Sequence, residues 1–293
     1  MKTGLVFSIL TALLFTACHS KDNTVRIATK PMTEQFILGE MLALLIENGT
    51  ELRPVVVKGI GGGTSNIHPA LLKGEFDLYP EYTGTGWLVV LKKDSLLPPQ
   101  ELYDRLSSEY HDRFSLAWIG PYGFNNAYSL AVNEEKARKY SLQKFSDLAR
   151  YPDLFSFGAE YDFFEIHEGY EALCRNYGLK FRKTVDMDIG LKYEAIKSGK
   201  IDVMNIFTTD AQLNGAQLTV LEDDKHFFPS YYCATVIRET TLAKHPELTQ
   251  VLSRMNHILT EQEMSELNYQ VEIAGRSERE VAENFLKQKG MIP

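Results

Sequence analysis

Strand-like and helix-like segments alternate along most of this chain, and that alternation limits its fold more than any other feature. Residues 25–30 predict a strand, residues 34–49 an apolar-striped helix ending at Gly49, and residues 51–59 a second strand. Strands that alternate with helices across short joints form mixed α/β sheets with helices on their faces. A chain of 293 residues suits two such lobes better than a single core.

The same order continues through the rest of the chain. Strands are expected at residues 116–120, 127–132, 154–160, 201–207 and 230–237, and helices at residues 100–110, 134–140, 169–178 and 193–199. Three further helices are expected to close the chain, at about residues 242–259, 262–271 and 278–289.

The first 17 residues have the composition of a targeting segment. Lys2 supplies a positive charge, residues 5–15 form an apolar run too short to span a bilayer comfortably, and Ala17 precedes Cys18. This arrangement is similar to a bacterial lipobox, in which Cys18 would be lipidated and become the mature N-terminus. The alternative is ordinary cleavage, which would release a free periplasmic protein. Elsewhere the sequence contains no apolar run of spanning length, so we predict that the chain is not itself a permease.

Residues 61–87, GGGTSNIHPALLKGEFDLYPEYTGTGW, contain the densest group of candidate ligand contacts. Thr64 or Ser65 is expected to cap a helix that Gly74 ends, and an apolar piece at residues 76–79 then leads into a glycine-rich turn with tyrosines and threonines. Such turns at strand ends commonly face ligands. The glycine run matches neither a dinucleotide fingerprint nor a phosphate-binding loop, so a plain strand-to-helix turn is an equal interpretation.

From about residue 25 to residue 293, the chain resembles the substrate-binding proteins of ABC transporters for glycine betaine, choline and related quaternary ammonium osmoprotectants. The resemblance rests on six motifs in order, which are ATKPMTEQFILGEML, GGTSNIHPALLKGEFDLYPEYTGTGW, GFNNAYSLAV, DIGLKYEAIKSGKIDV, TTDAQL and LEDDKHFFPSYYCATV. It implies an extracytoplasmic lipoprotein that captures a small solute and delivers it to ABC permease subunits.

The resemblance also implies a type II periplasmic-binding-protein fold, with two α/β lobes, a hinge and a ligand cleft between the lobes. After the signal peptide at residues 1–17, lobe one would comprise residues 24–125 and 229–293, and lobe two residues 126–228. The chain would cross between the lobes near residues 124–128 and 227–232, and its C-terminal helices would pack back on lobe one.

A quaternary ammonium ion has no N–H donor, so the faces of aromatic rings recognise its charge. The resemblance implies an aromatic cage of Tyr82, Tyr128, Phe207 and Tyr231, with Phe207 where a tyrosine is common in the family. It further implies a backbone carbonyl contact from Asn126. The alternative for each ring is ordinary core packing, since the chain has 15 tyrosines, 16 phenylalanines and two tryptophans.

For a ligand carboxylate, the resemblance implies Lys30 and Thr85 on lobe one and an arginine on lobe two. Ile166 occupies the position of that arginine, and an isoleucine cannot pair with a carboxylate. The alternative for Lys30 is a solvated lysine at a strand end. Because a partly unpaired carboxylate would be desolvated without compensation, we predict that choline or a bulkier trimethylammonium compound binds at least about tenfold more tightly than glycine betaine. His167 or a distant lysine are the alternatives for the missing arginine.

Other classes of function are disfavoured by the residues. The sequence has no G-x-S-x-G elbow, no H-E-x-x-H and no zinc-like Cys/His spacing, so we expect neither an enzyme nor a metal or cofactor. A formal charge of −8 argues against a nucleic-acid partner. Cys174 and Cys233 lie in separate apolar contexts, which favours two buried thiols over a disulfide. We expect a monomer; the alternatives are a receptor for ergothioneine or another cationic amphipathic solute, and a lobed enzyme or sensor domain.

Overall fold

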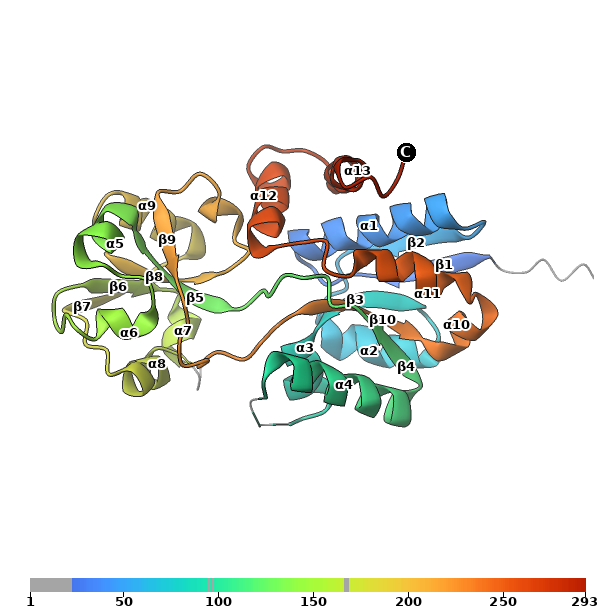
Figure 1. The fold of residues 1–293 in the computed structure, drawn as a ribbon, viewed down its shortest axis with the longest axis horizontal. Helices are drawn as coiled ribbons and strands as arrows, with labels where there is room; N and C mark the ends of the chain where they lie inside the picture. Colours follow the sequence, from blue (N-terminus) through green and yellow to red (C-terminus); the bar gives the residue numbers. More distant parts are fainter. Residues whose placement is uncertain (1–22, 94, 96, 166–168) are drawn as a thin grey trace, which may run out of the picture.

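The computed structural model describes residues 23–293 except residues 94, 96 and 166–168. It contains two α/β lobes, each built around one five-stranded sheet, as Figure 1 shows. The sheet of lobe one has the order β2-β1-β3-β10-β4, with β1, β2 and β3 parallel and β10 antiparallel to both β3 and β4. Its strands are β1 (Thr24–Ala28), β2 (Arg53–Val57), β3 (Leu78–Tyr82), β4 (Leu116–Ile119) and β10 (Cys233–Arg238).

The sheet of lobe two has the order β7-β6-β8-β5-β9. Its strands are β5 (Tyr128–Asn133), β6 (Ser156–Ala159), β7 (Lys183–Asp186), β8 (Val203–Phe207) and β9 (Leu218–Leu221). The sequence did not predict β7 or β9, and both are four-residue strands at the edges of the sheet. Edge strands are short and partly exposed, so they lack the apolar pattern that identifies a central strand.

The helices of lobe one begin with α1 (Thr33–Gly49), which buries its middle turns in the core and confirms the prediction for residues 34–49. The other helices are α2 (Thr64–Lys73), α3 (Thr83–Thr85), the π-helical turn η1 (Gly86–Val90) and α4 (Pro99–Phe114). Gly74 ends α2 in the left-handed conformation, as predicted. The predicted cap at Thr64 or Ser65 is wrong, because Gly63 holds that position and the Thr64 hydroxyl donates to Glu81 instead.

The helices of lobe two are α5 (Glu134–Tyr140), α6 (Phe145–Leu148), α7 (Tyr161–Glu165), α8 (Tyr170–Tyr177), α9 (Ile189–Lys197) and the 3-10 turn η2 (Ala211–Leu213). Phe145, Phe157 and Phe163 are fully buried among them, so aromatic rings supply much of the core of lobe two.

The chain ends in α10 (Glu239–Lys244), α11 (Glu247–Leu252), the 3-10 turn η3 (Ser253–Met255), α12 (Glu261–Glu272) and α13 (Glu278–Gln288). The prediction of one helix over residues 242–259 is wrong: Pro246, which has no N–H to continue α10, starts α11. Apolar side chains of α11, α12 and α13 pack against α1 in the core of lobe one. Helix α12 also contacts lobe two, since Ser265 Oγ donates to the Asp210 carbonyl at 2.7 Å.

Two segments connect the sheets, residues 120–127 between β4 and β5 and residues 222–232 between β9 and β10. They run side by side across the middle of the molecule in Figure 1, at the positions where the crossings were predicted. Asn126 N donates to the Tyr231 carbonyl at 3.1 Å, and Tyr231 N donates to Asn125 Oδ1 at 2.6 Å. These bonds join the two crossing segments, which together are called the hinge below. We propose the lobe boundaries given above, on either side of this hinge.

Candidate ligand-binding cleft between the lobes

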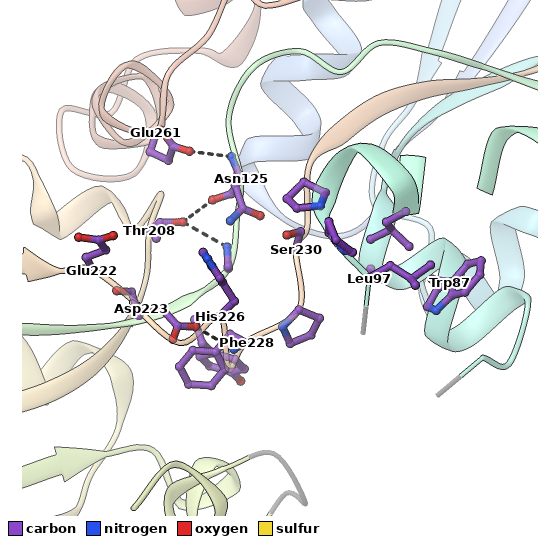
Figure 2. Close-up of a pocket in the computed structure, with 18 of the residues that line it drawn as sticks. Trp87, Leu97, Asn125, Thr208, Glu222, Asp223, His226, Phe228, Ser230 and Glu261 are labelled. Carbon is purple, nitrogen blue, oxygen red and sulfur yellow. Dashed lines mark hydrogen bonds between the residues drawn. The ribbon is translucent and has the colours of Figure 1, made fainter. Parts of the chain in front are cut away.

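A cavity of about 870 Å³ lies between the lobes, beside the crossing segments. Figure 2 shows Trp87 and Leu97 of lobe one on one side, His226 and Phe228 on the other, and Asn125 above His226. Asn125 is held from both sides, because its N–H donates to Glu261 Oε1 at 3.0 Å and its carbonyl accepts from Thr208 Oγ1 at 2.5 Å (Figure 2). The walls of this cavity therefore come from both lobes and from the hinge.

A smaller cavity of about 140 Å³ also lies between the lobes. Glu34 at the start of α1, Asn126 of the first crossing segment and Asn268 of α12 line it, together with Phe207 and Asp210 of lobe two. Neighbouring crossing residues therefore line different cavities, Asn125 the large one and Asn126 the small one.

Tyr128 and Phe207, two of the predicted cage residues, lie opposite each other on the antiparallel strands β5 and β8. Their rings stack with centroids 4.4 Å apart and planes inclined by 29°. A cation cannot lie between rings this close, so the pair can offer a ligand only its outer faces. Burial raises the pKa of Tyr128 to about 12, so its hydroxyl stays neutral at physiological pH. Tyr128 lines the large cavity and Phe207 the small one.

Tyr82, the predicted cage residue at the end of β3, is 5 % exposed. Its hydroxyl donates to the Glu34 carboxylate, and the Lys30 amino group lies over its ring, 4.6 Å from the centroid. One face of this ring is therefore already occupied by a cation of the protein itself. In this conformation a ligand could reach only the other face.

Lys30 is 8 % exposed and forms an ion pair with the fully buried Glu81. The same carboxylate accepts hydrogen bonds from Thr64 Oγ1 at 2.6 Å, Tyr79 OH at 3.1 Å and the backbone N–H of Tyr82 at 2.7 Å. Lys30 thus neutralises a buried charge behind the cleft. The sequence did not single out Glu81, because residues 80–86 were expected to form a turn, whereas β3 continues to Tyr82 and buries this carboxylate.

Tyr231, on the second crossing segment, is half-buried and packs against Gly84. A Cβ at Gly84 would lie 2.6 Å from the Tyr231 ring and 2.9 Å from the Ser230 carbonyl oxygen, so only glycine allows this approach. Thr85 is half-buried in α3. Ile166, the residue at the arginine position, lies outside the described residues, as does the predicted lipidation site Cys18.

Glu34 is a site residue that the sequence did not single out. It is 2 % exposed and accepts hydrogen bonds from Tyr82 OH, from Asn126 Nδ2 at 3.0 Å and from Asn268 Nδ2 at 3.5 Å. Burial raises the pKa of its carboxyl, and the hydrogen bonds oppose that effect only in part. Because β3, the first crossing segment and α12 all donate to it, Glu34 joins lobe one to the hinge. Only the assembled fold brings these donors together, which is why the sequence did not reveal its role.

Residues 23–288 match the family model of the substrate binding domain of ABC-type glycine betaine transport systems (OpuAC). The chain belongs to this family. Members of the family are binding domains of transporters, which confirms the prediction that the chain is not an enzyme. Within the described part of the chain, no helix is both long and apolar enough to cross a membrane.

Named relatives agree with this assignment. The chain is 45% identical over 274 residues to the ergothioneine transport permease/ergothioneine binding protein EgtU of Helicobacter pylori, covering 92% of this chain but only 48% of that protein. The chain therefore spans about half the length of this relative. It is 31% identical to the carnitine transport binding protein OpuCC of Listeria monocytogenes, covering 96% of this chain and 95% of the relative.

Solved structures agree on the fold. A glycine betaine/carnitine/choline ABC transporter structure has a TM-score of 0.87 at 31% identity, covering 91% of this chain and 99% of the other. Apo YehZ from Escherichia coli has a TM-score of 0.80 at 26% identity, covering 92% of this chain and 99% of the other. The predicted two-lobed periplasmic-binding-protein fold is thereby confirmed.

Proposed function

We propose that this chain is the solute receptor of an ABC importer and captures a small quaternary ammonium compound between its lobes. The observation that carries the proposal is the stacked pair of Tyr128 and Phe207, of which Tyr128 lines the large inter-lobe cavity and Phe207 the small one. Ring faces are the protein groups best suited to a cation that has no N–H donor, and each contributes about 0.5–2 kcal/mol.

The full cage would comprise Tyr82, Tyr128, Phe207 and Tyr231. Tyr82 belongs to lobe one, Tyr128 and Phe207 to lobe two, and Tyr231 to a crossing segment. Rings from both lobes can surround one cation only if the lobes move together around the hinge. Closure would also exclude water, which strengthens the attraction between the ammonium ion and the rings. The Asn126 carbonyl is the proposed additional contact to the ammonium methyl groups.

The carboxylate end of a betaine would be held weakly, by Lys30 and Thr85. Lys30 already neutralises Glu81, so a ligand carboxylate would have to share its charge. With Ile166 in place of an arginine, lobe two would supply no second cation there. We therefore retain the prediction that choline or a bulkier trimethylammonium compound is preferred to glycine betaine by about tenfold or more. Among bulkier betaines ergothioneine is favoured, since the relative at 45% identity is named for it.

The proposed partners follow from the family and from the leader-like first residues. The family model describes a transport system, and the name of the H. pylori relative joins a permease to a binding protein. We propose that the receptor acts as a monomer outside the cytoplasm, anchored to a bacterial membrane by lipid on Cys18, and delivers its solute to ABC permease subunits. Replacement of Cys18 by serine should move the protein from the membrane to the soluble fraction; an unchanged membrane fraction would refute the anchor.

A thermal-shift screen of the protein without its first 18 residues tests the ligand class. The panel would contain glycine betaine, choline, carnitine and ergothioneine, with proline and glutamine as solutes without a quaternary ammonium group. A ligand present at 100 times its dissociation constant stabilises a protein by about 2.7 kcal/mol, which such a screen detects. Stabilisation by at least one quaternary ammonium compound and by neither amino acid is the expected result. No response to any of the four would refute the proposed function.

A further inference from the structure

The small inter-lobe cavity is lined by hydrogen-bond acceptors and by no basic side chain. Glu34, Asp210 and Glu272 each contribute a carboxylate, while the other lining residues in the described part of the chain are apolar, hydroxyl-bearing or amide side chains. No group of metal-binding side chains is present within the described residues. The lining therefore suits an occupant that donates hydrogen bonds through nitrogen or oxygen.

Two amide side chains in the lining keep unused acceptors. Asn126 and Asn268 each have a buried Oδ1 without a hydrogen-bond partner among the described residues, and Asn268 is only 4 % exposed. Their amide orientations are fixed, because Asn126 Nδ2 donates to Glu34 and Asn268 Nδ2 donates to the Thr209 carbonyl at 2.9 Å. Rotating either amide would place its oxygen against another acceptor. Buried acceptors without partners are costly, so these two indicate a missing donor.

The Glu34 carboxylate points to the same kind of occupant. Its hydrogen-bond donors are the neutral side chains of Tyr82, Thr209, Asn126 and Asn268, and within the described ranges no Lys, Arg or His forms an ion pair with it. A buried carboxylate is much better stabilised by a donor that carries positive charge or belongs to a cationic molecule. A solute with one cationic end and one donor end would provide this.

We propose that the small cavity binds the hydrogen-bond donor end of the solute, an N–H of a heterocycle or an O–H, while the trimethylammonium group lies against Tyr128 and Phe207. This inference rests on the proposed function, because Phe207 lines the small cavity and stacks on the cage ring Tyr128. A volume of about 140 Å³ corresponds to roughly five water molecules, enough for one edge of a five-membered ring or for a hydroxyl with a water.

The receptor would then select a solute by its N–H or O–H donor as well as by its positive charge. Carnitine should bind about tenfold more tightly than its deoxy analogue γ-butyrobetaine, which lacks only the hydroxyl. Choline should likewise bind more tightly than its methyl ether. Among solutes with an imidazole ring, a free ring N–H should be preferred to its N-methylated form. Glycine betaine has neither an N–H nor an O–H, so it should bind more weakly than the solutes that carry such a donor.

Titration calorimetry of these matched pairs on the unmodified receptor is the test. Wild-type protein should prefer the donor-bearing member of each pair, and in Glu34→Gln and Asn268→Ala that preference should fall towards onefold. Glu266→Gln is the matched control, because Glu266 lies on α12 and accepts a hydrogen bond from Asn214 of lobe two but lines neither inter-lobe cavity. Its preference should equal that of the wild type.

The outcomes separate this inference from the function on which it rests. Equal affinity for both members of each pair in the wild type would overturn the inference and leave the receptor function standing. Binding of no trimethylammonium solute would overturn both. The wild-type comparison needs no variant, so poor folding of Glu34→Gln or Asn268→Ala would not prevent a decision.

Discussion

Replacement of Lys30 by methionine is expected to destabilise lobe one strongly. Methionine keeps most of the side-chain volume and removes the charge that neutralises the fully buried Glu81 carboxylate. Breaking a buried ion pair by removing one partner costs about 3–5 kcal/mol, since the other charge stays buried without compensation. Three neutral donors, from Thr64, Tyr79 and Tyr82, remain on the Glu81 carboxylate. The expected loss is therefore near the lower limit, about 3 kcal/mol.

Urea and thermal unfolding measure this loss directly. About 3 kcal/mol corresponds to a fall in Tm of roughly 6–12 °C for a protein of this size. The double variant Lys30→Met/Glu81→Gln removes the unpaired charge and should recover at least about 1.5 kcal/mol. Lys58→Met is the control, because the Lys58 side chain is 33% exposed and its pairs with Glu40 and Glu278 should contribute less than about 1 kcal/mol.

A Lys30→Met variant within about 1 kcal/mol of wild-type stability would refute this reasoning. If such a variant also lost affinity for betaines, Lys30 would act on the ligand and not as the counter-ion of Glu81. Loss of stability with unchanged affinity for choline is the result that the buried pair predicts.

Three further predictions concern the cage, the hinge and the effect of pH. Tyr128→Ala should weaken binding of a trimethylammonium ligand by about 1–2 kcal/mol, and Tyr128→Phe much less; equal calorimetric affinities for the alanine variant and the wild type would exclude the cage. Gly84→Ala should displace the Tyr231 ring, whose atoms would lie 2.6 Å from the new Cβ, and cost about 1–3 kcal/mol of stability in urea unfolding. Burial lowers the pKa of His68 below its ordinary 6.5, with Glu81 opposing the shift. As the pH falls through the ordinary pKa, the unfolded chain binds the proton more readily than the folded chain does, so the stability of the wild type should fall on acidification. The fall should be smaller in His68→Phe. If both proteins lost the same stability in urea unfolding between about pH 8 and about pH 5, this prediction would be wrong.

Much of the fold could be predicted because it depends on local patterns. The long apolar run of α1, the left-handed Gly74 after α2 and the alternation of strands and helices all follow from neighbouring residues, although α1 is buried on all sides over residues 37–46 and not along one stripe. Edge strands β7 and β9 could not be predicted, since their few apolar residues form a strand only when paired with β6 and β5, respectively. The short helix α3 and the π-helical turn η1 that follow β3 were also missed, because the glycines there favoured a loop.

The candidate site could likewise be predicted only in part. Motifs identified which residues to examine, but not what those residues contact in the folded chain. The stacking of Tyr128 on Phe207 comes from the register of β5 and β8, and the pairing of Lys30 with Glu81 comes from the packing of β3 beside β1. Glu34 gains its burial and its donors from segments more than 40 residues away in the chain, as its hydrogen bonds with Tyr82, 48 residues on, and Asn126, 92 residues on, show. Tertiary contacts of this kind leave no local pattern.

Recognition of a positive charge by aromatic rings is the central claim, and one calorimetric comparison tests it most directly. Choline and its uncharged isostere 3,3-dimethylbutan-1-ol have nearly the same shape and the same hydroxyl, but only choline carries the cation. With two or more rings each contributing about 0.5–2 kcal/mol, choline should bind at least about fivefold more tightly than the isostere. Equal affinities would mean that the cleft recognises shape and apolar surface alone, and would contradict the claim.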